Sequence, residues 1–217
     1  MIKIGHCCIE EQEVLYGPGK RLVIWVQGCT LHCKGCVNKE LWDKNKGKSY
    51  SSDYFVDIVK SNNLDGITLL GGEPMQQSEQ LLPLVKNITN LGKSIVCFTG
   101  YEIDELKKKS QIDILNLCDF LICGRFIESQ RNLYLQFRGS DNQKVYFPNG
   151  KYKDYKLKDG TNMALFTITP SGSIDCKGFQ PDELIDFVTE LAIKTDLWPI
   201  VPKYSELIRK NQKKSVF

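Results

Sequence analysis

The chain lacks any hydrophobic run long enough to cross a bilayer, and residues 1–8 (MIKIGHCC) have no apolar core of the length that a signal peptide needs. It also lacks a strong excess of one charge, since the net charge is +3 and the pI is about 8.3. A nucleic-acid-binding protein is expected to show a concentrated basic stripe, and the lysine runs here are short. We therefore expect a cytoplasmic protein with neither a membrane nor a nucleic acid as its partner.

Internal repeats and low-complexity linkers are absent as well, which argues against a repeat protein or a string of domains. A length of 217 residues, with 41% hydrophobic and 25% charged residues, is typical of one soluble globular domain. The sequence thus predicts a single domain over residues 1–217. Its core is expected at about residues 17–179, followed by a C-terminal helix and a basic tail in residues 180–217.

A disulfide framework is not expected despite nine cysteines, because the cytosol keeps thiols reduced. Cys97, Cys118 and Cys123 lie in apolar, strand-like runs, where a cysteine usually serves as a small buried hydrophobe. No second group of cysteines has the spacing of metal ligands. Metal binding therefore falls to the three cysteines of one short segment, residues 28–38 (GCTLHCKGCVN).

Cys29, Cys33 and Cys36 are the most informative residues of the chain. Three thiolates on one loop can hold three irons of a cubane cluster and leave the fourth iron open for a substrate. A structural zinc is the alternative, with His32 as the fourth ligand. However, adjacent His32 and Cys33 cannot easily point at one small ion, and the second cysteine pair of a zinc ribbon is missing. The iron–sulfur interpretation is favoured, and Gly28 and Gly35 let backbone N–H groups approach the cluster.

Strands and helices alternate through the first two thirds of the chain, which predicts βαβ units around a parallel sheet. Expected strands are residues 21–27, 67–70, 94–98 and 119–123; expected helices begin near Ser51 and cover residues 76–91 and 102–109. Further on, the pattern predicts a hairpin over residues 166–176 that turns at residues 170–172, a helix over residues 180–194, and a loose tail from Lys203.

The strand at residues 67–70 runs straight into Gly71, Gly72, Glu73 and Pro74. The cysteine loop and residues 99–101 (TGY) also follow strands, so all three segments are expected at one edge of the sheet, where α/β folds place their chemistry. Two glycines there expose backbone groups to a ligand, and Glu73 adds a carboxylate that can accept from an ammonium. S-adenosylmethionine (SAM) fits both segments, because its amino and carboxylate groups can chelate an open iron.

On these motifs the chain resembles the radical SAM superfamily, and within it the anaerobic ribonucleotide reductase activating proteins of the glycyl-radical-enzyme activating enzyme family. The resemblance spans about Gly17 to Phe179 and is carried by residues 25–29 (WVQGC), 33–36 (CKGC) with Asn38, 71–74 (GGEP), 99–101 (TGY) and 137–143 (FRGSDNQ). Gly35 before the third cysteine, in place of an aromatic residue, agrees with the reductase activators. Many relatives have Asp where this chain has Cys123, for which a buried thiol is the plainest interpretation.

The resemblance implies an α/β fold, a partial (β/α)6 radical SAM barrel with an irregular C-terminal hairpin and helix. It also implies an oxidoreductase with a [4Fe–4S] cluster and SAM, which is cleaved reductively to a 5′-deoxyadenosyl radical. Cys29, Cys33 and Cys36 would hold the cluster. Gly71, Gly72, Glu73 and Pro74 would lie at the methionyl end of SAM, Gly35 and Val37 near its adenine, and Thr99 along the same pocket. No role follows for Arg138, Asn142 and Gln143 beyond packing or substrate-side contacts.

The implied partners are a large glycyl-radical protein of the anaerobic ribonucleotide reductase type, whose glycine loses a hydrogen, and a flavodoxin- or ferredoxin-like electron donor. Two alternatives stay open. The first is a radical SAM enzyme that modifies a peptide or a nucleotide, although the chain lacks the second cysteine cluster that peptide-modifying relatives often carry. The second is a non-enzymatic iron–sulfur redox module, which would need a fourth protein ligand that the loop does not offer.

Overall fold

The computed structural model describes residues 1–10, 13–160, 164–168 and 174–178, and the chain divides into two compact units, Met1–Thr161 and Asn162–Phe217. The helices and strands are β1 (Ile2–Glu10), α1 (Glu13–Tyr16), β2 (Arg21–Val26), β3 (Lys48–Tyr50), α2 (Ser52–Ser61), β4 (Gly66–Gly71), α3 (Ser78–Asn90), β5 (Ser94–Thr99), α4 (Lys109–Leu117), β6 (Phe120–Cys123), β7 (Lys144–Tyr146), β8 (Ala164–Ile168) and β9 (Ile174–Gly178). Short 3-10 turns lie at Lys39–Leu41, Pro74–Gln77, Ile103–Glu105 and Glu128–Gln130.

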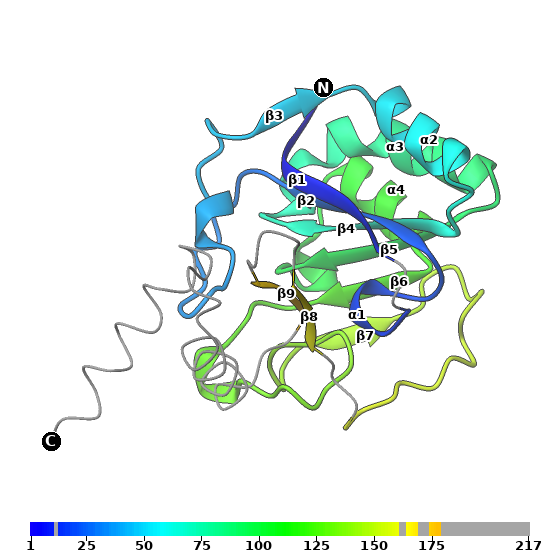
Figure 1. Cartoon of the computed structure of the whole chain (residues 1–217). Coiled ribbons are helices and arrows are strands. Elements are labelled where there is room, and N and C mark those ends of the chain that lie inside the picture. Colours follow the sequence, from blue (N-terminus) through cyan, green and yellow to red (C-terminus); the bar gives the residue numbers. More distant parts are fainter. Residues whose placement is uncertain (11–12, 161–163, 169–173, 179–217) are drawn as a thin grey trace, which may run out of the picture. The chain divides into compact units, whose positions relative to one another are not determined.

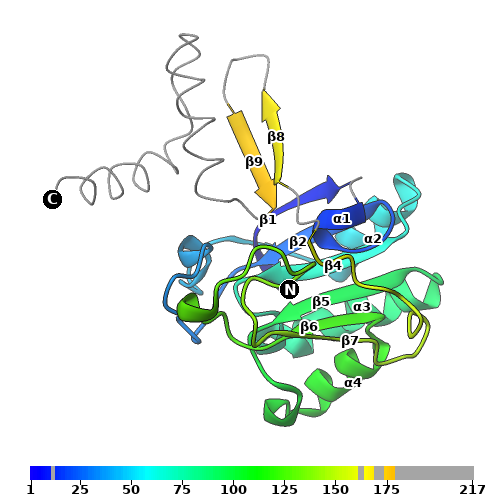
Figure 2. The same ribbon diagram turned by 90° about the horizontal axis from the view of Figure 1, so that it is seen from below.

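The first unit is built on a seven-stranded mixed sheet in the order β3-β1-β2-β4-β5-β6-β7 (Figure 1). Strands β2, β4, β5 and β6 run parallel, whereas β1, β3 and β7 pair antiparallel with their neighbours. Figure 2 shows β4, β5, β6 and β7 side by side. All of β2 and β6 is buried, as expected of parallel strands covered on both faces. The predicted α/β class is confirmed, while the partial (β/α)6 barrel stays a prediction.

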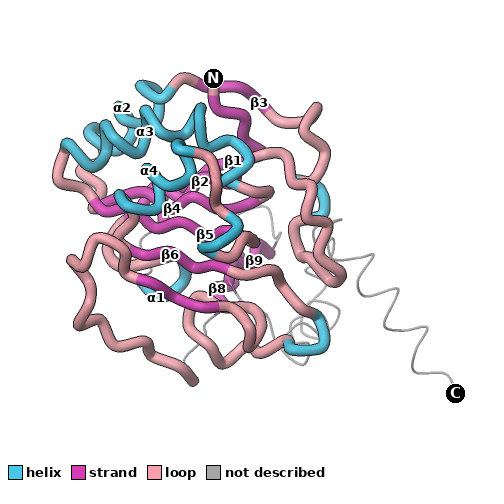
Figure 3. Tube along the Cα trace, turned by 180° about the vertical axis from the view of Figure 1, so that it is seen from behind, coloured by secondary structure: helices cyan, strands magenta, loops and turns pink. Residues whose placement is uncertain are grey.

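Helices α2, α3 and α4 lie together on one face of this sheet (Figure 3). Ser51 caps α2, because its hydroxyl accepts from the Tyr54 N–H as a residue at this position typically does. The predicted face of α3 is confirmed, since Leu81, Leu84, Val85 and Ile88 are all 0% exposed. These side chains join the buried residues of β2, β4 and β5 in the main hydrophobic core, whose burial supplies most of the driving force for folding.

Aromatic side chains cover part of the opposite face. Phe120 of β6 packs edge-on against Phe137, Phe147 and Tyr155, with ring centroids 6.1, 5.0 and 5.0 Å away. Val96 and Ile122 lie in the same cluster. The segment after β6, which the sequence left without a clear period, thus packs residues 137–157 onto the sheet.

The predicted helix over residues 102–109 is wrong. Glu102 and Glu105 form a reciprocal capping box around the 3-10 turn Ile103–Glu105, and Leu106 then turns to an extended conformation. The helix begins only at Lys109, where Lys108 takes the N-cap position. The basic run at residues 107–109 therefore opens α4 instead of closing a helix. The sequence analysis also missed the three antiparallel strands β1, β3 and β7.

In the second unit, β8 and β9 pair antiparallel from Ala164 with Gly178 to Ile168 with Ile174, which confirms the predicted hairpin strands. Its turn at residues 170–172, the helix predicted over residues 180–194 and the tail lie outside the described residues. The single-domain prediction stays a prediction. Among the described helices, none combines the length and apolar character that crossing a membrane demands.

Candidate functional site

Three loops meet where the parallel strands end, as the sequence predicted. The cysteine loop follows β2, residues 72–74 follow β4, which ends at Gly71, and residues 100–101 follow β5, which ends at Thr99. The blue cysteine-bearing segment lies at the left in Figure 1. Backbone hydrogen bonds join the first two loops, because Gly72 N–H donates to Val26 O over 2.8 Å and Glu73 N–H donates to Gly28 O over 2.9 Å. The two motifs singled out in the sequence are therefore neighbours.

Gly71 and Gly72 are needed for this approach. Gly71 has φ +107°, and a Cβ atom on it would lie 2.6 Å from the Trp25 Cα. A Cβ on Gly72 would clash with the carbonyl oxygen of Gly28. Only glycine lets the end of β4 pass so close to the end of β2, so both residues act here through the space they leave open.

Glu73 is buried, with 1% of its surface exposed. Its Oε1 accepts from Met75 N–H at 2.8 Å and from the Thr99 hydroxyl at 2.7 Å, and its Oε2 accepts from Gly100 N–H at 2.8 Å. Burial raises the pKa of this carboxyl to about 7, although the three hydrogen bonds oppose the rise. In this arrangement the carboxylate ties the loop after β4 to the loop after β5, and its predicted contact with an ammonium stays a prediction.

Gln76 is a site residue that the sequence analysis missed. Its Oε1 accepts from Thr30 N–H at 3.1 Å, while its Nε2 donates to the Thr30 hydroxyl at 2.8 Å and to the Tyr101 hydroxyl at 3.0 Å. One carboxamide thus links the cysteine loop, the turn after β4 and the loop after β5. No sequence signal marks it, because a glutamine just before a helix usually faces solvent.

The cysteine loop is anchored at its start to the 3-10 turn that follows it. Gly28 N–H donates to Leu41 O over 2.7 Å, and Cys29 N–H donates to Trp42 O over 3.1 Å. Further along, Cys36 N–H donates to Cys33 O over 3.1 Å and closes a tight turn between these two cysteines. The loop is therefore shaped by its own backbone.

Backbone N–H groups point at two of the three sulfur atoms. Burial raises the pKa of the Cys29 thiol, and the N–H groups of Leu31 and His32, which donate to this sulfur, counteract part of that rise. Burial also raises the pKa of Cys33, and here the opposing hydrogen bond comes from Phe126 N–H. Donors placed in this way stabilise thiolates bound to iron and tune the potential of a cluster.

A single-ion site does not fit this loop. The His32 ring packs against the Trp42 ring at 4.6 Å, and His32 has φ +49°. Over residues 1–10, 13–160, 164–168 and 174–178, no three His, Cys, Asp or Glu side chains converge on a point where one metal ion would sit. A cubane cluster does not need three side chains to meet at one ion, because each thiolate binds a different iron. Three thiols on one loop, with N–H donors at two of them, are the donor set that a cubane cluster uses.

The segment after β6 is a fourth element of the site. Arg125 makes a two-pronged ion pair with Glu105, at 2.7 and 2.8 Å, and its guanidinium lies 5.8 Å from the centroid of the Tyr101 ring. Phe126 supplies the N–H group that reaches Cys33. From this region the sequence singled out only Cys123, the last residue of β6.

Cys123 itself is 0% exposed, as are Cys97 and Cys118, so the three predicted buried thiols are confirmed. The Cys123 thiol points at the Glu102 carboxylate, with the sulfur 3.9 Å from Oε2. Burial, together with this negative charge, raises the pKa of Cys123 to about 11. The thiol is therefore protonated at neutral pH and does not replace an ionised aspartate.

The other predicted SAM residues differ in exposure. Thr99 and Pro74 are buried, Gly35 is half-buried with φ +77°, and Val37 is 82% exposed. Gly35 and Val37 belong to the cysteine loop, and Thr99 bonds to Glu73, so all of them lie in the connected loops. Which of them contact SAM stays a prediction.

Comparison with known proteins agrees with this site. The model of a family described as a 4Fe-4S single cluster domain matches residues 15–146. The fold and the match to this family together define an α/β protein that carries one 4Fe–4S cluster.

An anaerobic ribonucleoside-triphosphate reductase-activating protein from Salmonella typhi is 35% identical over 143 residues, which cover 62% of this chain and 92% of the relative. The proteins of the same name from Escherichia coli K12 and Enterobacteria phage T4 are 34% and 31% identical, with 92% and 88% of their length covered. The chain belongs to this family of activating proteins.

The crystal structure of QueE from Escherichia coli is a further neighbour, with a TM-score of 0.40, 22% identity, and coverage of 46% of this chain and 52% of that chain. A likeness of this degree adds nothing to the assignment.

Proposed function

We propose that this protein is a radical SAM activating enzyme whose product is a glycyl radical on an anaerobic ribonucleoside-triphosphate reductase. One observation carries the proposal: the loop with three cysteines is hydrogen-bonded to the Gly71–Glu73 turn at the carboxyl edge of the sheet. A cluster held by three thiolates and a neighbouring stretch of open backbone meet the two needs of SAM chemistry in one place. The partner is taken from the names of the relatives.

Cys29, Cys33 and Cys36 would hold the cluster. When bound and reduced, such a cluster supplies the electron that cleaves SAM to methionine and a 5′-deoxyadenosyl radical. The remaining work falls to the chain. Leu31, His32 and Phe126 direct N–H groups at the cysteine sulfurs. These donors favour the more negative, reduced state of the site.

Gly71 and Gly72 are half-buried beside the cysteine loop, and the amino and carboxylate groups of SAM would lie next to them. Glu73 acts mainly as a brace, because each carboxylate oxygen already accepts at least one hydrogen bond from the protein. Gln76 holds Thr30 and Tyr101 at the same place. Loops tied to one another in this way would orient the cofactor and keep water from a reactive radical.

The finer fold and partner predictions belong to the same proposal. The four parallel strands β2, β4, β5 and β6 would form the centre of a partial (β/α) barrel, and an electron donor of the flavodoxin or ferredoxin type would reduce the cluster. Modification of a peptide or a nucleotide is the second candidate reaction, and a redox module without SAM chemistry is the third.

The test is anaerobic incubation of the reconstituted, dithionite-reduced protein with SAM, with 5′-deoxyadenosine followed by chromatography. Wild type should form it, Cys33→Ala should not, and Cys7→Ala should behave as wild type because Cys7 lies in β1 away from the loop. An intact, reducible cluster without product would leave the redox module as the better account.

A second arm identifies the substrate. The reduced protein is mixed with SAM and an anaerobic ribonucleoside-triphosphate reductase, and the glycyl radical is sought by electron paramagnetic resonance. A radical on the reductase supports the activating role. Formation of 5′-deoxyadenosine without that radical would favour a peptide or nucleotide substrate.

A further inference from the structure

The motif at residues 137–143 contacts the segment that follows β6. Asn142 Nδ2 donates to Arg125 O over 2.8 Å, and Gln143 Nε2 donates to Gly124 O over 2.9 Å. Two consecutive side chains thus hold two consecutive carbonyl groups, 17 and 19 residues earlier in the chain. Sequence analysis assigned neither carboxamide a role.

The oxygen atoms of both carboxamides also accept hydrogen bonds, and these set the orientation of the two side chains. Gln143 Oε1 accepts from Gly139 N–H at 2.7 Å and from Ser140 N–H at 3.3 Å. Asn142 Oδ1 accepts from the hydroxyl of Ser140 at 2.8 Å, and Ser140 is 0% exposed. With each oxygen occupied by a donor of the motif, each NH₂ group must face Gly124 or Arg125. The contact is therefore directional and not a loose surface contact.

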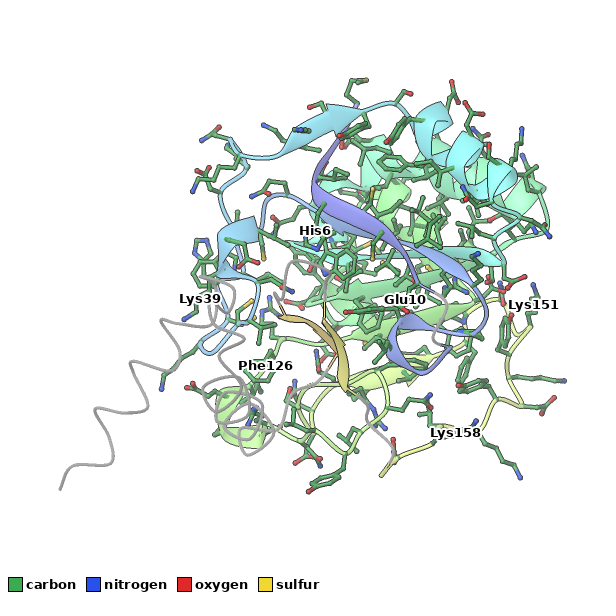
Figure 4. All side chains as sticks on the ribbon, in the orientation of Figure 1. His6, Glu10, Lys39, Phe126, Lys151 and Lys158 are labelled. Atoms are coloured by element: carbon green, nitrogen blue, oxygen red, sulfur yellow. The ribbon has the colours of Figure 1, made fainter. Side chains whose placement is uncertain are left out.

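The held segment borders the cysteine loop at two points. The Glu128 carboxylate lies 3.1 Å from the Lys34 ammonium. A backbone hydrogen bond from Phe126 also lowers the pKa of Cys33, against the rise that burial causes. A Cβ on Gly35 would lie 3.0 Å from Glu128 Oε1, so the two segments are already in close contact. Figure 4 labels Phe126 on the side of the molecule that carries the cysteine-bearing segment.

The clamp acts directly on the Phe126 N–H group, because this N–H and the carbonyl oxygen of Arg125 belong to the same peptide group. A hydrogen bond from Asn142 to that oxygen fixes the plane of the peptide, and with it the direction of the N–H bond. Displacing the peptide plane would turn the donor away from the sulfur.

We propose that Asn142 and Gln143 are positioning residues for the iron–sulfur cluster: they hold the peptide between Arg125 and Phe126 so that its N–H group points at the Cys33 corner. This inference rests on the cluster of the proposed function but not on cleavage of SAM. Donors to a cluster thiolate stabilise the reduced, more negative state and raise the reduction potential. Loss of the clamp should therefore lower the midpoint potential.

The experiment is a redox titration of the reconstituted full chain without SAM, followed by the electron paramagnetic resonance signal of the reduced cluster. Wild type is compared with Asn142→Ala and Gln143→Ala at equal iron per chain. Asn132→Ala is the matched control, because Asn132 bonds to Asp141 and Tyr134 in the same segment and touches neither Gly124 nor Arg125. Both clamp variants should titrate at a lower potential than wild type, and the control should titrate with wild type.

Unchanged potentials in folded, fully loaded clamp variants would overturn the proposal and leave the motif a packing role. Equal shifts in the clamp variants and in Asn132→Ala would overturn it too. If Asn142→Ala does not fold, Asn142→Ser replaces it, since the shorter hydroxyl stays near Ser140 but cannot reach Arg125 O. Because no turnover is needed, the titration gives its answer even if the protein fails to cleave SAM.

Discussion

A fully buried charged side chain lies at each end of the parallel strands, Arg21 at the amino end and Glu73 at the carboxyl end. At the amino end, Arg21 is 1% exposed and donates to the Thr68 and Ser94 hydroxyls and to the carbonyl groups of Pro18, Ile67 and Ser94. At the carboxyl end, Glu73 is equally buried and accepts from Met75, Thr99 and Gly100. Both are satisfied by neutral partners, as buried charges without an ion pair must be.

The partners differ in kind, and this difference separates stability from function. Thr68, Ile67 and Ser94 belong to β4 and β5, so Arg21 ties strands to one another. Glu73 instead joins the loops that border the cysteines. Burial lowers the pKa of Arg21 to about 10 and raises that of Glu73 to about 7, so of these two groups only Glu73 titrates near neutral pH. The hydrogen bonds of Arg21 at the amino edge stabilise the sheet, whereas those of Glu73 at the carboxyl edge hold the loops of the candidate site.

Arg21→Met should have the largest effect. The apolar chain fills similar space but leaves two carbonyl groups of β4 and β5 and the Ser94 hydroxyl with fewer partners. The loss of unfolding free energy should be about 4 kcal/mol, measured by urea denaturation. Lys60→Met, at an exposed site on α2, should change it by less than about 0.5 kcal/mol.

If the two edges are separate in function, Arg21→Met should leave the cluster site unchanged. Folded, reconstituted Arg21→Met should bind as much iron and show the same midpoint potential as wild type. A large change in potential without a stability loss would mean that the two edges are not separate in function.

The Glu73 carboxyl should make stability depend on pH. Its pKa is 4.5 in the unfolded chain and about 7 in the folded chain, so between these values the folded chain holds the proton more tightly. The unfolding free energy should therefore fall as pH rises through this window, by at most about 3 kcal/mol. Denaturation of the cluster-free chain at several pH values measures it.

Glu73→Gln is the control, because an amide does not titrate and its curve should lack this slope. A wild-type curve that rises from pH 4.5 to 7, or two parallel curves, would show that Glu73 is ionised throughout in the folded chain. The hydrogen bonds between Glu73 and the two loops would then be made by a carboxylate and not by a protonated carboxyl group.

Gly35→Ala should have an intermediate effect on stability and should also lower iron binding. Comparison with Gly92→Ala separates these two effects. Gly35 has φ +77° and faces Glu128, whereas Gly92, between α3 and β5, has φ +72° and nothing within 4 Å of a Cβ. Each alanine should cost about 1 kcal/mol of unfolding free energy for its backbone conformation. Only Gly35→Ala should also lower the iron bound per chain, because its methyl group pushes against Glu128 beside the cysteines. Equal iron in both variants would contradict a tight contact there.

Local patterns were enough to predict the four parallel strands and the position of the site. The apolar runs of β2, β4, β5 and β6 and the caps of α2 are visible in short windows, and strand order then brings their carboxyl ends together. The spacing of Cys29, Cys33 and Cys36 needs no tertiary information either.

What the sequence could not predict depends on the third dimension. Nothing local tells that Glu73 turns inward to Thr99, or that Gln76 reaches back 46 residues to Thr30. The N–H group of Phe126 carries no side-chain signal at all, and the start of α4 was misplaced because a lysine run reads equally well as either end of a helix. Contacts between loops are decided by the whole fold, and functional edges consist mostly of such contacts.

Lys34→Gln should have the smallest effect, although Lys34 stands between Cys33 and Cys36, two of the proposed cluster ligands. Its ammonium pairs with Glu128 at 3.1 Å, but the two side chains are 91% and 48% exposed, so water and salt screen the attraction. The unfolding free energy should change by less than about 0.5 kcal/mol. Lys109→Gln, which breaks the exposed pair with Asp113 on α4, is the matched control and should give the same small change. A loss above about 1 kcal/mol for Lys34→Gln alone would mean that surface charge helps to shape the cysteine loop. The expected equality would instead leave that task to the hydrogen bonds of Glu73, Gln76 and the Asn142–Gln143 clamp.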